Sequence, residues 1–70
     1  MRFIMIDTIE NQQEAVNPMM ISNIAMFDDP RGSYVGIFMN GGHLIRTQFT
    51  NIDSAIDYIQ RAPSISLEGA

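Results

Sequence analysis

Apolar residues along this chain come in short runs that are separated by polar, turn-forming segments, a pattern typical of a small sheet. Residues 3–6 form a continuous apolar run, which predicts a strand that is buried on both sides or central in a sheet. The polar residues 10–14 predict a reversal, and residues 15–16 predict a short second strand. Pro18 then predicts a bend, because proline keeps the residue before it out of helical geometry.

The next apolar run leaves two readings open. Residues 21–27 fit a seven-residue strand, but the spacing of Met20, Ile21 and Ile24 also fits a helix within residues 19–27. The strand is favoured because Pro18 precedes the run and a strong turn signal at residues 28–32 follows it.

Two further strands are predicted around a glycine-rich turn. Residues 33–39 are rich in β-branched and aromatic side chains, which favours a strand. Asn40, Gly41 and Gly42 predict a tight reversal, because such residues accept positive φ angles. Residues 44–49 are then expected to be the antiparallel mate of the preceding strand.

The last periodic segment predicts the only helix. Thr50 is a candidate N-cap, Asp53 suits the positive end of a helix, and Pro63 ends the segment. An apolar stripe is expected at Ile52, Ala55, Ile56 and Ile59. The fold class is therefore α+β, an antiparallel β-meander of four to five strands with one C-terminal helix packed on one face. Residues 1–62 are expected to form a single domain, and residues 63–70 a loose C-terminal tail.

Apolar residues on both faces of the sheet exceed what this helix can cover. On the strand at residues 33–39, Tyr34 and Phe38 point to one side, and Val35 and Ile37 to the other. The pattern does not tell which face the helix covers. The uncovered face should expose an apolar patch of the kind that marks interaction sites, unless residues 19–20 or the tail lie across it.

Composition limits what can stabilise and extend so small a core. The 70 residues contain no Cys and only one His, which excludes disulfides and leaves too few ligands for a structural metal site. No cofactor is expected. Homo-oligomerisation is the remaining way to supplement the core. The net charge of −4 makes nucleic acid an unlikely partner. No signal peptide or membrane span is recognisable, so a cytoplasmic protein without a membrane partner is expected.

Chemistry-bearing residues indicate binding and not catalysis, and we expect no enzymatic activity. No nucleophile has the sequence context of a known hydrolase motif. Candidate interaction residues are the turn residues Asp28, Asp29 and Arg31 together with the aromatic residues Tyr34 and Phe38, because Tyr and Arg often dominate interface energy. A small anionic ligand is a further possible partner, with candidate binding residues Gly41, Gly42, His43 and Arg46.

Three segments together resemble the small flagellar-operon, swarming-motility proteins. The segments are Val16-Asn17-Pro18 followed by Ile21 and Ile24, residues 35–42 followed by Ile45, and Thr50 followed by Ala55, Ile56 and Ile59. The likeness spans about residues 3–60. It implies a regulatory or assembly role without active-site residues. This chain departs from the family's pattern in having no Gly near Asn11 and fewer basic residues.

A second resemblance, in composition and architecture, is to phage-encoded defence inhibitors, which are similarly small, acidic and free of cysteine. It implies a phage-type inhibitor that acts by protein–protein occlusion. Such a protein needs an adaptable surface and negative charge to occupy a cationic groove. We take occlusion of a protein target as the leading hypothesis. A regulatory or assembly factor and an oligomer that sequesters a small ligand are the alternatives.

Overall fold

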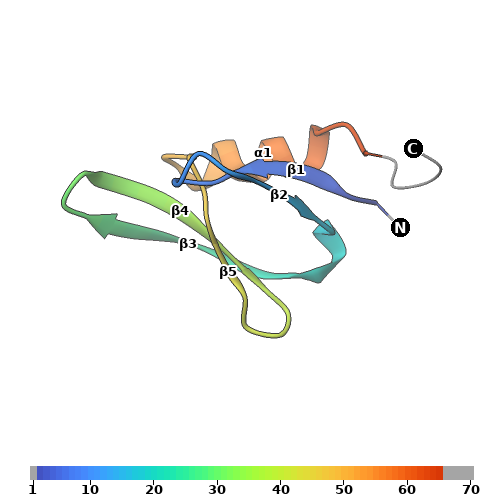
Figure 1. Ribbon diagram of the computed structural model, residues 1–70, viewed down its shortest axis with the longest axis horizontal. Helices are drawn as coiled ribbons and strands as arrows, with labels where there is room; N and C mark the ends of the chain where they lie inside the picture. Colours follow the sequence, from blue (N-terminus) through green and yellow to red (C-terminus); the bar gives the residue numbers. More distant parts are fainter. Residues whose placement is uncertain (1, 66–70) are drawn as a thin grey trace.

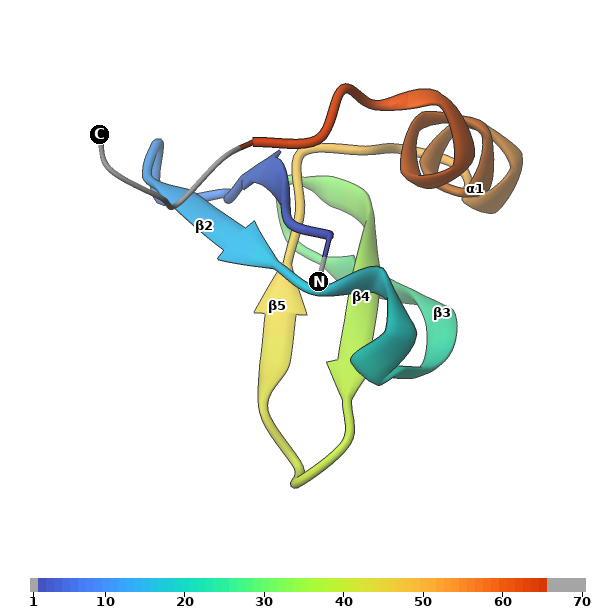
Figure 2. The ribbon, with the colours of Figure 1, turned by 90° about the vertical axis from the view of Figure 1, so that its right-hand side faces the viewer.

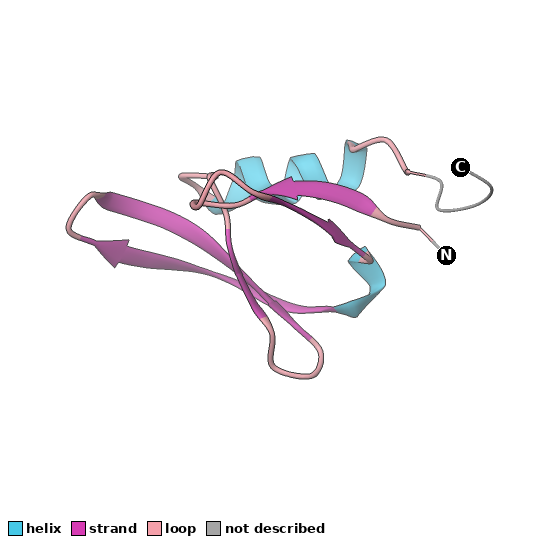
Figure 3. Ribbon diagram, in the orientation of Figure 1, coloured by secondary structure: helices cyan, strands magenta, loops and turns pink. Residues whose placement is uncertain are grey.

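Five strands and one helix account for most of residues 2–65, which are the residues that the computed structural model describes. The elements, in chain order, are β1 (Ile4–Asp7), β2 (Gln13–Val16), the 3₁₀ helix η1 (Pro18–Met20), β3 (Ile21–Asp29), β4 (Gly32–Met39), β5 (Leu44–Arg46) and α1 (Ile52–Arg61). Every strand pair is antiparallel, so the predicted α+β class is confirmed (Figure 3).

The strands form two sheets, where the sequence predicted one meander. One sheet pairs β1 with β2, and the other has the order β3-β4-β5. Thr47 joins them, because it forms a bridge with Thr8 while its backbone nitrogen donates to the Val35 carbonyl at 2.9 Å. The β1–β2 hairpin and α1 therefore form one layer, and the three-stranded sheet forms the other (Figure 1).

The core lies between these two layers. Its buried apolar side chains come from both sheets, from α1 and from the C-cap of that helix, namely Ile4, Ile6, Val16, Val35, Ile37, Ile45, Ala55 and Ala62. Because side chains alternate along a strand, burial of Val35 and Ile37 turns Tyr34 and Phe38 to the opposite face of the sheet. The helix thus covers the Val35 and Ile37 face, which the sequence left undecided.

The ends of α1 differ in detail from the sequence prediction. Asn51 is the N-cap, and its side chain accepts a hydrogen bond from the Ser54 backbone nitrogen at 2.8 Å. Thr50 is therefore not the cap, since the helix begins one residue later than that assignment requires. Ile56 is also outside the buried stripe, with 39% of its surface exposed. Tyr58 packs against the core in its place, and its hydroxyl donates to the Met5 carbonyl.

Residues near the two ends of the described chain lie side by side. The Arg2 guanidinium donates to the Ala62 carbonyl at 2.7 Å and to the Ile59 carbonyl at 3.2 Å. Phe3 forms an antiparallel bridge with Ile65. Of the tail predicted at residues 63–70, the part up to Ile65 is therefore attached to the domain, and residues 66–70 lie outside the described residues, as does residue 1.

Turn chemistry explains where the chain reverses. Residues 21–27 belong to β3, which settles the choice between strand and helix in favour of the strand. The strands continue to Asp29 and Gly32, so the reversal predicted over residues 28–32 is shorter, with only residues 30–31 between paired positions. Gly41 and Gly42 have φ angles of 97° and 96°, as the predicted reversal requires. Residues 44–49 form a strand only as far as Arg46.

Candidate interaction surface

Three aromatic side chains cover the sheet face that α1 leaves open. Phe27 on β3 stacks on Tyr34 of β4, with ring centroids 5.6 Å apart, and is tilted against Phe38 at 5.8 Å. We call Phe27, Tyr34 and Phe38 the aromatic cluster. All three side chains are only partly buried. The structure thus brings together Tyr34 and Phe38, two of the predicted interaction residues, through a third aromatic residue that the sequence analysis did not select.

Gly36 makes this arrangement possible. A Cβ atom at Gly36 would lie 2.5 Å from Cε2 of Phe27, so the Phe27 ring occupies the space above the glycine. The Leu44 side chain lies on the other side of the same position, 3.1 Å from that Cβ. The pairing of Phe27 with Tyr34 follows from the short turn at residues 30–31 and two-residue alternation. This register is the signal that could have identified Phe27 from the sequence.

The acidic residues stand at the far end of the β3–β4 hairpin, which extends beyond the helix (Figure 1). Asp28 and Asp29 are both exposed. One Asp28 oxygen accepts a hydrogen bond from the Ser33 hydroxyl at 2.6 Å, and Asp29 accepts one from the Arg31 backbone nitrogen at 2.7 Å. These bonds hold both carboxylates at the hairpin end. By strand alternation Asp29 lies on the same face as the aromatic cluster, and Asp28 lies with Ser33 on the opposite face.

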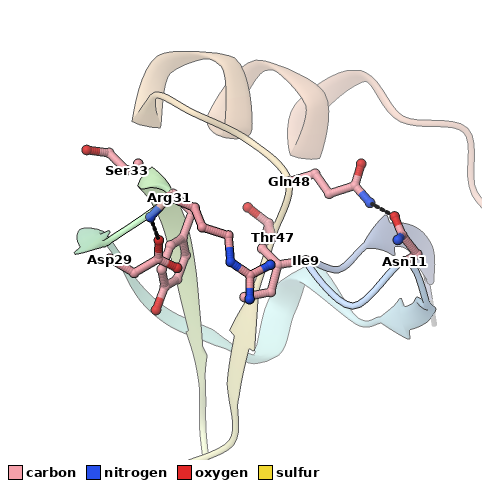
Figure 4. A pocket seen from close by; sticks show the side chains of 9 residues that line it. Ile9, Asn11, Asp29, Arg31, Ser33, Thr47 and Gln48 are labelled. Atoms are coloured by element: carbon pink, nitrogen blue, oxygen red, sulfur yellow. Dashed lines mark hydrogen bonds between the residues drawn. The ribbon is translucent and has the colours of Figure 1, made fainter.

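Arg31 borders an open cleft between this hairpin end and the β1–β2 turn. The cleft has a volume of about 290 Å³ and also contains Asp29 and Tyr34 in its lining. Figure 4 shows the Arg31 side chain extending into it, with Gln48 and Asn11 at the opposite end. Three of the five predicted interaction residues thus meet in one place.

Polar side chains hold the far wall of the cleft. The Gln48 side-chain nitrogen donates to the Thr8 carbonyl at 2.8 Å and to the Asn11 side-chain oxygen at 3.3 Å. Asn11 has a φ angle of 61°, in the left-handed region that favours glycine and admits asparagine. The contact of Gln48 with the β1–β2 turn depends on packing between distant segments, so no local pattern could have revealed it.

The residues predicted to hold a small anionic ligand are not brought together. Gly41 and Gly42 form the β4–β5 turn, and His43 Nε2 lies 2.9 Å from a Glu14 carboxylate oxygen on the core side. Arg46 pairs with Gly36 on the opposite face of the sheet, the face of the aromatic cluster. Arg46 is three residues after His43, an odd number, so side-chain alternation directs the two side chains to opposite faces of the sheet.

Other site classes have no support among the described residues. In residues 2–65, no three His, Asp or Glu side chains gather in a way that could hold a metal ion. The same part of the chain has no helix with the length and apolar character needed to cross a membrane.

Comparisons with protein-family models, with curated proteins and with solved structures found no match to this chain.

Proposed function

We propose that this protein is a non-catalytic acidic binding module that occludes a cationic surface of a target protein with the far end of its β3–β4 hairpin. One observation carries the proposal: the aromatic cluster, on the sheet face that α1 leaves open, is followed at the hairpin end by the exposed acids Asp28 and Asp29, of which Asp29 shares its face. Aromatic side chains supply the buried centre of a protein interface, and charges at its rim steer the encounter and select the partner.

Charge favours a cationic target over other kinds of protein. The chain carries a net charge of −4, and two exposed carboxylates stand at the end of the hairpin, Asp29 on the face of the aromatic rings and Asp28 on the opposite face. Arg31 and Arg46 border the same region and can pair with carboxylates of the target. Occlusion needs no reacting group on this chain, because a docked hairpin excludes the competing substrate by its volume.

The test compares two double variants with the same change in net charge. Asp28→Asn with Asp29→Asn removes two acids from the hairpin end, and Asp53→Asn with Asp57→Asn removes two from the helix. Proteins captured on the immobilised chain from a lysate of a flagellated bacterium would each be purified and titrated against both variants.

We expect only the hairpin double variant to lose affinity, and the salt dependence of binding to weaken with it. A captured target that binds both variants equally well would contradict the acidic docking surface. A target that belongs to the motility apparatus and keeps its activity when bound would instead favour the regulatory or assembly role that the motility resemblance implies.

A second candidate function is capture of a small anionic ligand in the cleft beside Arg31. The cleft volume of about 290 Å³ and the convergence of Arg31, Asn11 and Gln48 favour it. Native mass spectrometry of gently purified protein tests it, because a retained ligand would add mass to the intact chain. A spectrum of the protein without added mass would count against ligand capture.

A further inference from the structure

Strand β3 has an unpaired edge, and the orientation of its backbone can be worked out from the neighbouring strand. The Val35 nitrogen donates to the Phe49 carbonyl, and the Val35 carbonyl accepts from Thr47, so both groups of Val35 point away from β3. Met26 is opposite Val35 in the register. It therefore belongs to a non-hydrogen-bonded pair, and its own N–H and C=O point to the free edge, as do those of Ile24 two residues earlier.

This edge lacks the residues that usually prevent strands from pairing between molecules. Residues 21–27 contain no charged side chain and no proline. A register shift between Ile21 and Asn23 distorts only the start of the strand. From Asn23 to Phe27 the edge is regular, and within residues 2–65 no other strand pairs with it.

Exposed apolar side chains flank the same edge. Met26 is 40% exposed and lies on the face that carries the helix, since it pairs with the buried Val35. In α1, Ile56 and Tyr58 lie on opposite sides of the buried Ala55, because each residue turns the helix by about 100°. Tyr58 points to β1, where its hydroxyl meets the Met5 carbonyl.

Ile56 therefore lies on the β3 side of the helix, and it is 39% exposed. Figure 2, which views the molecule along its long axis, shows α1 above β3. Met26 and Ile56 are thus two exposed apolar side chains beside the same unpaired strand edge.

We propose that two copies of the chain pair antiparallel through β3, with Ala25 opposite Ala25 at the two-fold axis. Ile24 of each copy then lies opposite Met26 of the other, and the edge-facing backbone groups of these residues complete hydrogen-bonded pairs. The two three-stranded sheets become one continuous sheet. Met26 and Ile56 are buried at the junction.

The distribution of charge along β3 favours antiparallel pairing of this edge with a second copy of the chain. The register places the acidic end of each β3 beside the uncharged start of its partner, so the two pairs of carboxylates lie at opposite ends. A parallel pairing would align Asp28 and Asp29 of one copy with the same residues of the other, which is unfavourable. The two-fold axis is perpendicular to the sheet, so both aromatic clusters remain uncovered on one face.

Sedimentation velocity on matched methionine variants tests the pairing. Met26→Lys places a charge at the junction, whereas Met19→Lys makes the same change at a residue that is 84% exposed on η1. We expect the wild type and Met19→Lys to sediment as dimers and Met26→Lys as a folded monomer. A monomeric wild type, or a dimer that survives Met26→Lys, would overturn the proposal. So would loss of the dimer only in the variant that combines Tyr34→Ala with Phe38→Ala, which would place the contact on the sheet face.

Hydrogen exchange of the unmodified protein gives a second measurement that does not depend on folding of a variant. The amides of Ile24 and Met26 should exchange more slowly as protein concentration rises, because pairing covers them. The amide of Ala25 faces β4 in the same chain, so its exchange should change much less. Equal exchange of the Ile24 and Met26 amides at low and high concentration would refute the pairing.

Discussion

Replacing Arg2 with methionine should destabilise the fold strongly although the residue lies near the start of the chain. Methionine keeps the apolar stem, so the variant removes only the guanidinium. That group donates to the Ile59 and Ala62 carbonyls at the end of α1 and to the Ser64 hydroxyl. Hydrogen bonds from a charged donor each contribute roughly 1.5–3 kcal/mol. Because Arg2 is only partly buried, solvent screening brings the expected loss well below the sum of three such bonds, to about 2 kcal/mol in total.

Urea unfolding measures this loss against a matched control. With a slope of about 1 kcal/mol per molar urea for a chain of this size, the midpoint should fall by about 2 M. Arg61→Met removes the same group from an exposed pair with Asp57 in the same helix, for which about 0.3–0.5 kcal/mol is expected. Equal midpoint shifts for the two variants, with unchanged slopes, would refute the view that Arg2 attaches the segment before β1 to the end of the helix.

Two further substitutions test local features of the fold. Asn51→Ala should lower the free energy of unfolding by about 1 kcal/mol and Thr50→Ala by much less, because only the Asn51 side chain caps α1; a larger effect of Thr50→Ala in urea unfolding would contradict this assignment. Gly36→Ala should displace the Phe27 ring and cost about 1 kcal/mol through lost stacking. Unchanged NMR shifts of the Tyr34 ring in that variant would show that the cluster had not moved.

Local patterns were sufficient to predict most elements, because each depends on neighbouring residues. The apolar run of β1, the glycine turn after β4 and the helix before Pro63 all follow from such patterns. Thr50 and Asn51 are adjacent and both capable caps, so the local pattern does not single out Asn51 as the N-cap. Ile56 fits the apolar stripe because it is apolar, but Tyr58 packs against the core and its hydroxyl bonds the Met5 carbonyl, while Ile56 is exposed.

Contacts between distant segments limited what could be predicted of the site. The meeting of Arg31 with Asn11 and Gln48 depends on the bridge between Thr8 and Thr47, which no periodicity encodes. Separation of His43 from Arg46, in contrast, follows from strand alternation and could have been inferred. The aromatic cluster could be predicted only in part. Its register follows from the turn, but its exposure depends on where α1 packs.

The contacts of Arg2 and Phe3 with the end of the domain have a consequence for synthesis on the ribosome. Arg2 is bonded to Ser64, 62 residues further along the chain, and Phe3 is paired with Ile65. The β3–β4–β5 sheet is built from neighbouring segments and can form as soon as they emerge, whereas Arg2 and Phe3 must wait for Ser64 and Ile65. Completion of the fold is therefore a late event, and translation must extend past Ile65 before the segment that precedes β1 can be fixed in place.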